Sequence, residues 1–318
     1  MCSSAPPAAY RWTDETGGAA GSGGQDRDGQ RRASTDESGR RRRLEYPPAP
    51  EPLPVPVVDN HTHLDFRDGL VEVGVREALD AAEAVGVHRA VQVGCDLPSS
   101  RFTVEAVDAD PRLLGAVALH PNDAPRYAAR GELEAAYAEI ESLAAHPRIR
   151  AIGETGLDYF RTHGEALSVQ ADSFRWHIDL AKRLGKTLQI HDRDAHDDVV
   201  RVLAEEGAPE RVVFHCFSGD EALVRVCNEN GWFMSFAGTF TFKNAAGLRE
   251  ALAVADPGRV LVETDAPFLT PHPYRGRPNA SYMVPYTVRA MAEVLGADLA
   301  ALCARIGTNT EEAYGLWD

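Results

Sequence analysis

Residues 149–191 read IRAIGETGLDYFRTHGEALSVQADSFRWHIDLAKRLGKTLQIH and contain a complete strand–helix–strand unit. The apolar run Ile149–Gly153 predicts a buried strand, and Leu188–His191 predicts a second one. Between them, Phe174–Leu184 has apolar residues at the i, i+3 and i+4 spacing of an amphipathic helix. Strands that are joined through a helix pair in parallel, whereas antiparallel neighbours need only a short turn. The stretch therefore predicts a parallel α/β fold.

The same alternation continues on both sides of this unit. Eight short apolar runs rich in β-branched residues occur in the chain, at Val55–Asp59, Ala90–Gly94, Leu114–Leu119, Ile149–Gly153, Leu188–His191, Val212–His215, Trp232–Phe236 and Val260–Glu263. Further helical periods include Leu133–Leu143 and Ala222–Cys227, and a last helix pair is expected at Tyr286–Leu295 and Leu299–Ile306. Eight such units close naturally into a (β/α)₈ TIM barrel. A doubly wound open sheet is the alternative, but no GxGxxG motif follows the first strand.

The first 52 residues differ in composition from the rest of the chain. They contain Gly-rich, Ser-rich and charge-mixed runs such as GGAAGSGGQDRDGQ, and few large apolar residues. Such a segment buries too little surface to offset its ordering entropy. We therefore predict a disordered tail over residues 1–52 and one barrel domain over residues 53–318, which is close to the usual length of ~250 residues. The basic block Arg40–Arg43 is a candidate nucleic-acid or partner contact, although a solvated tail is the simpler interpretation.

The chain carries a formal net charge of −15 over 318 residues. Residues 1–52 contain eight acidic and eight basic side chains, so the whole negative excess belongs to the barrel domain. This argues against a protein that coats duplex DNA, because such proteins usually present a basic face. If the chain handles DNA, we expect local contact in which metal ions supply much of the positive charge.

The cysteines and the apolar runs bear on location. The five cysteines are odd in number, widely spaced and without a CxxC pair: Cys2, Cys95, Cys216, Cys227 and Cys303. This pattern favours reduced thiols in a cytosolic protein over a disulfide framework. The N-terminus has no apolar h-region and no run approaches 18 apolar residues, so we expect a cytoplasmic protein without a signal peptide or membrane span.

Metal-competent side chains recur at the carboxyl ends of the predicted strands. The first strand ends in Asp59-Asn60-His61-Thr62-His63, and alternate residues of an extended segment point the same way, so His61 and His63 can hold one ion. The other candidates at strand ends are Glu154, His191, His215, Glu263 and Asp265. Each alone has an ordinary explanation, such as a core histidine with one hydrogen bond or a carboxylate in a salt bridge. Together they lie on the rim that carries the chemistry of TIM-barrel enzymes, and chance does not explain the whole set.

The set is typical of a binuclear metal centre, since imidazole suits Zn and carboxylate suits Mg or Mn. One ion would be held by His61, His63 and Asp265, and the second by His191 and His215, with Glu154 bridging the two. Two ions roughly 3.5–4 Å apart activate a water and stabilise both the attacking and the leaving oxygen. Asp265 is then the natural proton acceptor, so Asp265 and Glu154 are the candidate catalytic residues.

Five blocks, in the order HTHLDF, GETGLDYFR, QIHDRDA, FHCFSG and VLVETDAPFLTP, closely resemble the signature blocks of TatD-family metal-dependent deoxyribonucleases, within the amidohydrolase superfamily. The resemblance runs from about Val57 to Leu316 and ends in NTEEAYGL. It implies a TIM barrel with two divalent ions (Mg, Mn or Zn), in some members three, and it supports the six ligands assigned above. Glu263 matches a residue that would serve the further ion. The implied reaction is hydrolysis of DNA phosphodiester bonds, as a 3′–5′ exonuclease on single-stranded or frayed ends.

Three further residues are candidate substrate contacts. His120 lies in LHPND after the third strand, where the family has a similar His-Pro pair. Arg275 lies in the loop after the eighth strand, in a region that commonly binds phosphate in this fold, and an arginine can clamp phosphate bidentately. Arg193, just after His191, is a candidate phosphate contact or a partner of Asp192.

Two other functions compete with the nuclease. The first is hydrolysis of an ester or amide, such as removal of a D-amino acid from tRNA, because a two-metal hydroxide attacks either kind of centre. In the amide and triester hydrolases of the superfamily a modified lysine on the fourth strand often bridges the metals, whereas here Glu154 occupies that position. The second is a non-catalytic metal or nucleic-acid binding protein, which predicts at least one broken ligand, and none is broken.

Overall fold

The computed structural model describes residues 5–12, 31–35 and 39–317. Its sheet has eight strands that pair in parallel in sequence order, from β1 to β8. The strands are β1 (Val57–Thr62), β2 (Val87–Gly94), β3 (Leu113–Val117), β4 (Ile149–Asp158), β5 (Thr187–Arg193), β6 (Val212–Phe214), β7 (Phe233–Phe236) and β8 (Val260–Val262). The end of β1 also contacts the chain after β8, where the N–H of Asp265 donates to the carbonyl of His61 at 2.9 Å. The sheet is thus a nearly closed barrel, and the predicted TIM barrel is confirmed.

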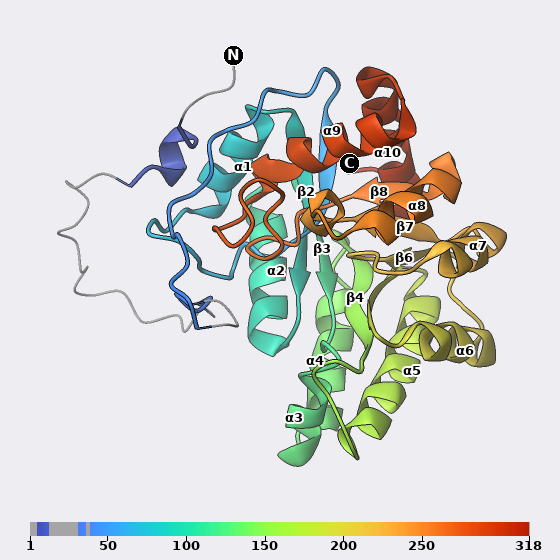
Figure 1. Ribbon diagram of the computed structural model, residues 1–318. Coiled ribbons are helices and arrows are strands. Elements are labelled where there is room, and N and C mark those ends of the chain that lie inside the picture. Colours follow the sequence, from blue (N-terminus) through green and yellow to red (C-terminus); the bar gives the residue numbers. More distant parts are fainter. Residues whose placement is uncertain (1–4, 13–30, 36–38, 318) are drawn as a thin grey trace, which may run out of the picture.

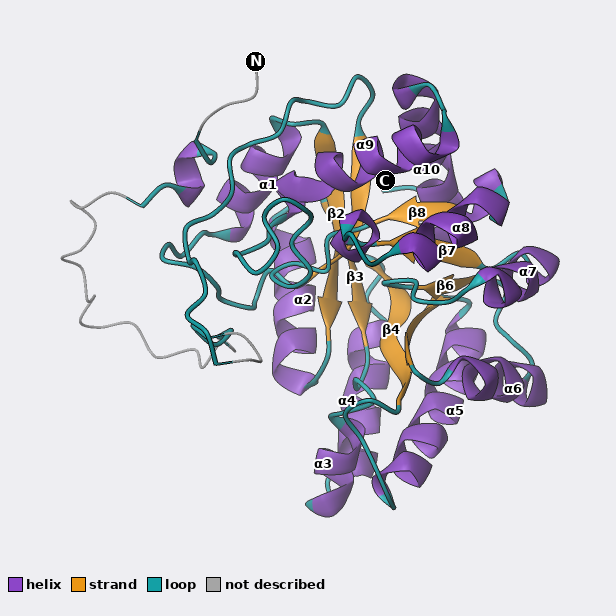
Figure 2. Ribbon diagram, in the orientation of Figure 1, coloured by secondary structure: helices purple, strands orange, loops and turns teal. Residues whose placement is uncertain are grey.

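Helices lie outside the strands, as Figures 1 and 2 show. They are α1 (Val75–Glu83), α2 (Leu97–Ala109), α3 (Ala124–Ala129), α4 (Leu133–Ala144), α5 (Ala166–Leu184), α6 (His196–Glu206), α7 (Glu221–Asn230), α8 (Ala246–Val254), α9 (Val284–Leu295) and α10 (Leu299–Tyr314). Within the described residues, no helix combines the length and the apolar character that crossing a membrane requires.

The joint between α5 and β5 illustrates how the sequence directs this alternation. Phe174, Ile178 and Ala181 lie on one face of α5 and are fully buried. The helix ends at Leu184 and is followed by Gly185, whose φ of 63° lies in the left-handed region that glycine adopts without a steric penalty. Strand β5 begins two residues later at Thr187, and its length carries His191 to the carboxyl end of the barrel.

Two hydrophobic layers make up the core. The layer between strands and helices contains alternate strand residues such as Leu113 and Val117 of β3. The other alternate residues, Leu114 and Ala116, belong to a second cluster that also contains Trp317 from the C-terminus. The period of two along each strand therefore separates a helix-facing from a barrel-filling set, and the barrel interior is packed rather than open.

The described parts of residues 1–52 lie against the barrel, whereas we expected disorder over the whole stretch. The ring of Tyr10 lies 4.5 Å from that of Tyr46 and 5.1 Å from that of Tyr282, and all three residues are buried. Arg42 forms a two-pronged ion pair with buried Asp68, at 2.6 and 3.0 Å. The remainder of the predicted tail lies outside the described residues, and the domain boundary after residue 52 stays a prediction.

Candidate active site

The alternation of side chains along the strands brings polar residues to the mouth of the barrel. Val213 of β6 and Leu261 of β8 point into the barrel interior. Two residues further along, His215 and Glu263 keep that direction just beyond the strand ends. His191 lies at the corresponding level of β5.

Strands β1 and β4 reach the mouth through irregular pairing. The register of β1 against β2 shifts between residues 59 and 62, and that of β4 against β5 shifts between residues 152 and 155. Such a bulge re-aims the side chains within it. His61 lies inside the first of these stretches and Glu154 inside the second. The residue before Glu154 is Gly153, and a Cβ on it would come within 2.5 Å of a side-chain carbon of β5. The close approach of the strands thus requires glycine immediately before the glutamate.

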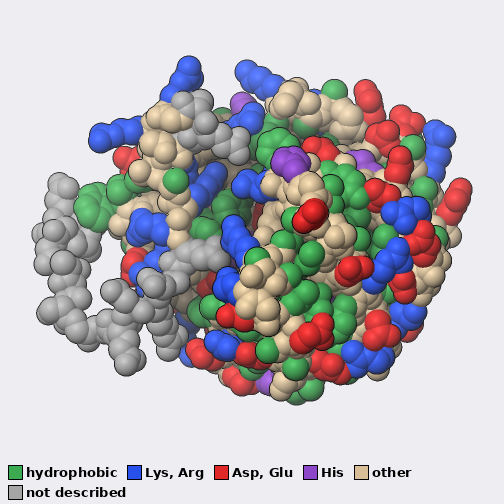
Figure 3. All heavy atoms as spheres, turned by 90° about the horizontal axis from the view of Figure 1, so that it is seen from below, with side chains coloured by type: hydrophobic (Ala, Val, Ile, Leu, Met, Phe, Trp, Pro, Cys, Tyr) green, Lys and Arg blue, Asp and Glu red, His purple; other side chains and the backbone are tan. Residues whose placement is uncertain are grey.

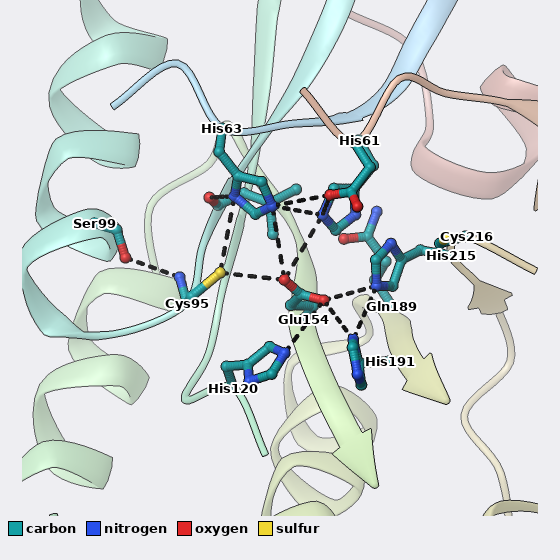
Figure 4. Close-up of polar contacts among 12 residues, drawn as sticks. His61, His63, Cys95, Ser99, His120, Glu154, Gln189, His191, His215 and Cys216 are labelled. Atoms are coloured by element: carbon teal, nitrogen blue, oxygen red, sulfur yellow. Dashed lines mark hydrogen bonds and ion pairs between the residues drawn. The ribbon is translucent and has the colours of Figure 1, made fainter. Parts of the chain in front are cut away.

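Glu154 lies at the centre of the cluster, with histidine rings on both sides (Figure 4). Its Oε1 is 3.8 Å from Nε2 of His61 and 3.7 Å from Nε2 of His63. Its Oε2 is 3.1 Å from Nδ1 of His191 and 2.7 Å from Nε2 of His215. One carboxylate, which is only 4% exposed, therefore faces two separate pairs of histidines with different oxygens.

The first pair of histidines shares a third neighbour, Asp265. The Nε2 atoms of His61 and His63 are 3.1 Å apart, and Oδ1 of Asp265 lies 3.8 and 3.3 Å from them, respectively. Nδ1 of His63 lies 3.0 Å from the carbonyl of Val93, to which it can donate, and this contact turns Nε2 toward the other two residues. The three side chains converge on one point at the mouth.

The second pair of histidines, His191 and His215, contacts two further carboxylates on the sides of the rings that face away from Glu154. Nε2 of His215 and Nδ1 of His191 are 3.4 Å apart. On their far sides, Nδ1 of His215 lies 3.3 Å from Oε1 of Glu263, and Nε2 of His191 lies 3.3 Å from Oδ2 of Asp158. These carboxylates fix the orientation of the rings, and the second oxygen of buried Glu263 has no hydrogen-bond partner among the described residues.

These separations fit divalent ions. Ligand atoms bonded to one ion at about 2.1 Å lie roughly 3 to 4 Å from one another, which is the range found in both groups. Four sets of His, Cys, Asp or Glu side chains in the described part of the chain have ligand atoms within 4.8 Å of one another, and all four lie in this cluster. The cluster offers two kinds of donor, because imidazoles suit Zn and carboxylates suit Mg or Mn.

The same packing shifts the pKa values of the histidines. Burial and neighbouring His215 hold the pKa of His61 well below its ordinary value. Burial opposes the charged form of His63 as well, but the carboxylates of Asp265 and Glu154 outweigh it and raise the pKa to about 9. For His215, the nearby Glu154 and Glu263 likewise outweigh burial and raise the pKa well above the usual range. Negative potential from the carboxylates thus attracts a cation, whether a proton or a metal ion.

The family described as TatD related DNase matches residues 58–315, which include every candidate ligand. The chain belongs to the TatD family. It is 47% identical over 264 residues to the protein named uncharacterized metal-dependent hydrolase TatD of Mycobacterium tuberculosis, a match that covers 82% of this chain and 98% of the relative. It is 38% identical over 238 residues to the hydrolase YabD of Bacillus subtilis, with 74% and 90% of the two chains covered. Like these relatives, the TatD-family chain described here is a metal-dependent hydrolase.

Solved structures of other TatD proteins have the same fold. The TatD homologue YjjV of Escherichia coli superposes with a TM-score of 0.74 at 22% identity, over 82% of this chain and 98% of that one. A TatD-family hydrolase of Entamoeba histolytica superposes with a TM-score of 0.71 at 17% identity, over 82% and 99%. At these identities the likeness concerns the fold.

Of the three candidate substrate contacts of this TatD protein, one lies within the histidine cluster and the other two stack on aromatic rings. His120 lies in the cluster itself, with Nε2 3.8 Å from Oε2 of Glu154, and burial lowers its pKa to about 3, so it is neutral. Arg193 stacks over Phe160 with its guanidinium carbon 4.0 Å from the ring centre. Arg275 is exposed and lies over Phe242, at 4.4 Å. Its role in binding substrate stays a prediction, as do those of His120 and Arg193.

The structure adds residues that the motifs did not indicate. Sγ of Cys95 lies 3.2 Å from Oε1 of Glu154 and 3.8 Å from Nδ1 of His63. Asp59 accepts hydrogen bonds from both the N–H and the hydroxyl of Thr264, at 2.8 and 2.6 Å, and so fixes the chain that carries the neighbouring Asp265. The sequence did contain one indication that Cys95 lies at the barrel mouth, because this residue directly follows a predicted strand.

Proposed function

We propose that this TatD protein hydrolyses phosphodiester bonds of DNA and removes nucleotides from the 3′ ends of single-stranded or frayed strands. The observation that carries the proposal is the position of Glu154. Its two oxygens face two separate histidine groups, which is the arrangement of a carboxylate that bridges two ions.

The proposed ligands follow from the two groups. His61, His63 and Asp265 would hold one ion and His191 and His215 the other, with Glu154 between them. Divalent ions bound there would lower the pKa of a water and stabilise charge on the phosphate oxygens. Glu263, whose second oxygen is buried without a partner among the described residues, is the proposed ligand for a further ion.

The protein side chains have separate tasks in this proposal. Asp265 is more exposed than the other carboxylate that faces both His61 and His63, with a side chain that is 14% exposed against 6% for Glu154. It can therefore reach the attacking water and take its proton. His63 is held against Val93 and Asp265 and keeps that carboxylate in place. Neutral His120 can donate a hydrogen bond to a substrate oxygen without adding charge to the site.

Bound divalent ions would supply the positive charge that a phosphodiester substrate requires at this site. The barrel domain is strongly acidic, so general attraction cannot hold a nucleic acid, and binding must rely on the metal centre and nearby arginines. The family description, TatD related DNase, supports DNA as the substrate class.

The test is release of nucleotides from a labelled single-stranded DNA by the purified protein with Mg²⁺, Mn²⁺, Zn²⁺ or EDTA. Substrates labelled at either end distinguish 3′ from 5′ removal, and Glu154→Ala serves as the inactive control. Metal-dependent loss from the 3′ end, absent in the variant, would support the proposal. Loss from the 5′ end only, or internal cuts, would leave the nuclease but reject the polarity.

Absence of cleavage with every metal, in a protein that binds two ions per chain, would reject the nuclease. The assay would then turn to ester and amide substrates, of which D-aminoacyl-tRNA is the first. Absence of any hydrolysis together with retained ion binding would instead indicate a protein that binds without catalysis.

A further inference from the structure

A short N-terminal segment outside the family match lies across the rim of the barrel mouth. We call residues 31–35 together with 41–42 the arm; its two strands pair through a bridge between Thr35 and Arg41 and a hydrogen bond from Arg42 to Ser34. The family match begins only at residue 58. The arm is therefore an addition of this chain to the barrel.

The arm is attached to two loops that both leave the carboxyl ends of strands. On the loop after β1, the backbone of Arg31 forms a β-bridge with that of Arg67, and the guanidinium of Arg42 forms an ion pair with buried Asp68 at 2.6 Å. On the loop after β8, Nη1 of Arg32 donates to the carbonyl of Pro267 at 2.7 Å, and Nε of Arg42 donates to the carbonyl of Gly276 at 3.0 Å. These two loops carry candidate ligands at their first residues, so the arm is fixed beside the site.

Arg32 connects the arm to the cluster through an aromatic ring. Its guanidinium carbon is 5.3 Å from the ring centre of Phe268, and that ring packs edge-on against His63, with centres 6.3 Å apart. Burial and the neighbouring Arg42 lower the pKa of Arg32, and the carboxylates of Asp68 and Asp265 partly oppose this shift. Its side chain packs against Phe268 but remains 25% exposed, so part of the guanidinium is accessible to solvent.

The arm has more positive than negative charge. Asp68 already accepts two hydrogen bonds from Arg42, and Arg32 lies further from it, at 3.5 Å. The guanidinium of Arg31 donates to the backbone carbonyl of Gly69 at 3.3 Å. Asp68 is therefore shared by Arg42 and Arg32, and the arm, which has arginines at positions 31, 32, 41 and 42 and no acidic residue, keeps a positive charge. In Figure 3, which shows the end of the molecule toward which β2 and β3 point in Figure 1, Lys and Arg side chains gather on the side of the N-terminal segment.

We propose that the arm is part of the substrate site and that Arg32 binds a phosphate next to the one that is cleaved. This inference rests on the proposed action on DNA and adds a subsite to it. An arginine that is fixed by a backbone contact and stacked on an aromatic ring is pre-organised, so it loses little entropy when it binds phosphate. In a domain with a large negative charge, such a local cation also offsets repulsion between protein and substrate.

The test compares substrates that have one phosphate with longer ones. Arg32→Ala should raise KM for a longer single-stranded oligonucleotide roughly tenfold, the effect of one lost charged hydrogen bond. The rise should be clearly smaller for a dinucleotide, which has only the scissile phosphate. The slope of log KM against log salt should fall by about 0.7, as for one phosphate contact on a single strand. Arg32→Lys should recover part of the loss.

A matched control is Arg225→Ala, which removes one arginine from the exposed outer face of α7 and breaks only a pair with Glu221. Equilibrium binding of a non-hydrolysable phosphorothioate version of the oligonucleotide with Mg²⁺, followed by fluorescence anisotropy, gives a readout that does not depend on turnover. Equal effects of Arg32→Ala on short and long substrates, or an unchanged salt slope, would overturn the inference while the nuclease stands. A wild-type protein that cleaves no DNA would overturn the proposed function itself, and the subsite with it.

Discussion

Oε2 of Glu154 lies 2.7 Å from Nε2 of His215. The other oxygen of this glutamate faces a different histidine, His63, at 3.7 Å. A carboxylate in this position can hold two ions only if both of its oxygens are acceptors.

Glu154→Gln keeps the shape of the side chain but replaces one oxygen by an NH₂ group, which cannot bind a cation. We expect the variant to retain less than the full complement of ions and to lose DNA cleavage by at least ~100-fold. Metal content by mass spectrometry and the rate of nucleotide release check the two parts. Glu221→Gln, at an exposed surface pair on α7, is the control for the loss of one charge. Full metal content together with full activity in Glu154→Gln would exclude the bridging role.

Asp265→Asn tests the proton acceptor. Asp265 has a φ of 53°, in the left-handed region, where asparagine is tolerated far better than alanine, so the asparagine variant avoids added backbone strain. We expect kcat to fall by about 10²- to 10⁴-fold, the usual effect of losing a general base. Pre-steady-state and steady-state rates on labelled DNA measure it, and circular dichroism checks the fold. A variant that loses substrate affinity but keeps kcat would instead assign Asp265 a binding role.

Metal affinity should increase with pH. Burial opposes charge on His63, but Asp265 and Glu154 outweigh it and raise its pKa to about 9, so the metal-free protein keeps a proton there at neutral pH. A metal ion must displace that proton, which means that Kd for Mn²⁺ should fall as the pH rises toward 9. Calorimetry in buffers of different ionisation enthalpy counts the protons released per ion. Affinity that does not depend on pH, with no proton release, would contradict this assignment.

Asp158 should act on the metal through His191. Its Oδ2 lies 3.3 Å from Nε2 of His191, whose other nitrogen faces Glu154. Asp158→Asn leaves every candidate ligand in place, so we expect a 10- to 100-fold loss of affinity for one ion only, the usual effect of an outer-shell carboxylate. Titration with Mn²⁺ separates the two affinities. Asp179→Asn, on the outer helix α5 where Asp179 pairs with Arg183, should leave both affinities as they are.

The strand ends could be predicted from the sequence because they depend on local pattern. His191 and His215 follow apolar runs directly, and a strand of known length fixes the level at which its last residue lies. Glu154 was predicted from its glycine-flanked position, although the bulge that turns it inward has no local signal that would distinguish it from regular strand.

The remaining residues of the site depend on contacts between distant parts of the chain. Cys95 meets Glu154 only because β2 and β4 converge at the mouth, and no spacing in the sequence records that. Arg32 lies in a stretch whose composition indicates disorder, and it reaches Phe268 because Asp68 and Gly276 hold neighbouring Arg42. A prediction of disorder from amino-acid composition averages over the whole segment, so it does not detect a few residues within it that pack against the barrel.

The packing of the N-terminal segment leads to a prediction on stability. Tyr46 is buried between Tyr10 and the barrel, and its hydroxyl donates to the carbonyl of Asp68 at 3.2 Å. Tyr46→Ala removes a large buried ring and should lower the free energy of unfolding by about 3 kcal/mol. Trp12→Ala is the control, because this similarly large ring is 44% exposed and its loss should have little effect. Urea unfolding measures both through the shift in midpoint at constant slope. Equal, small shifts in the two variants would mean that the segment adds nothing to the fold, whereas a selective loss in Tyr46→Ala would make it a structural part of the barrel.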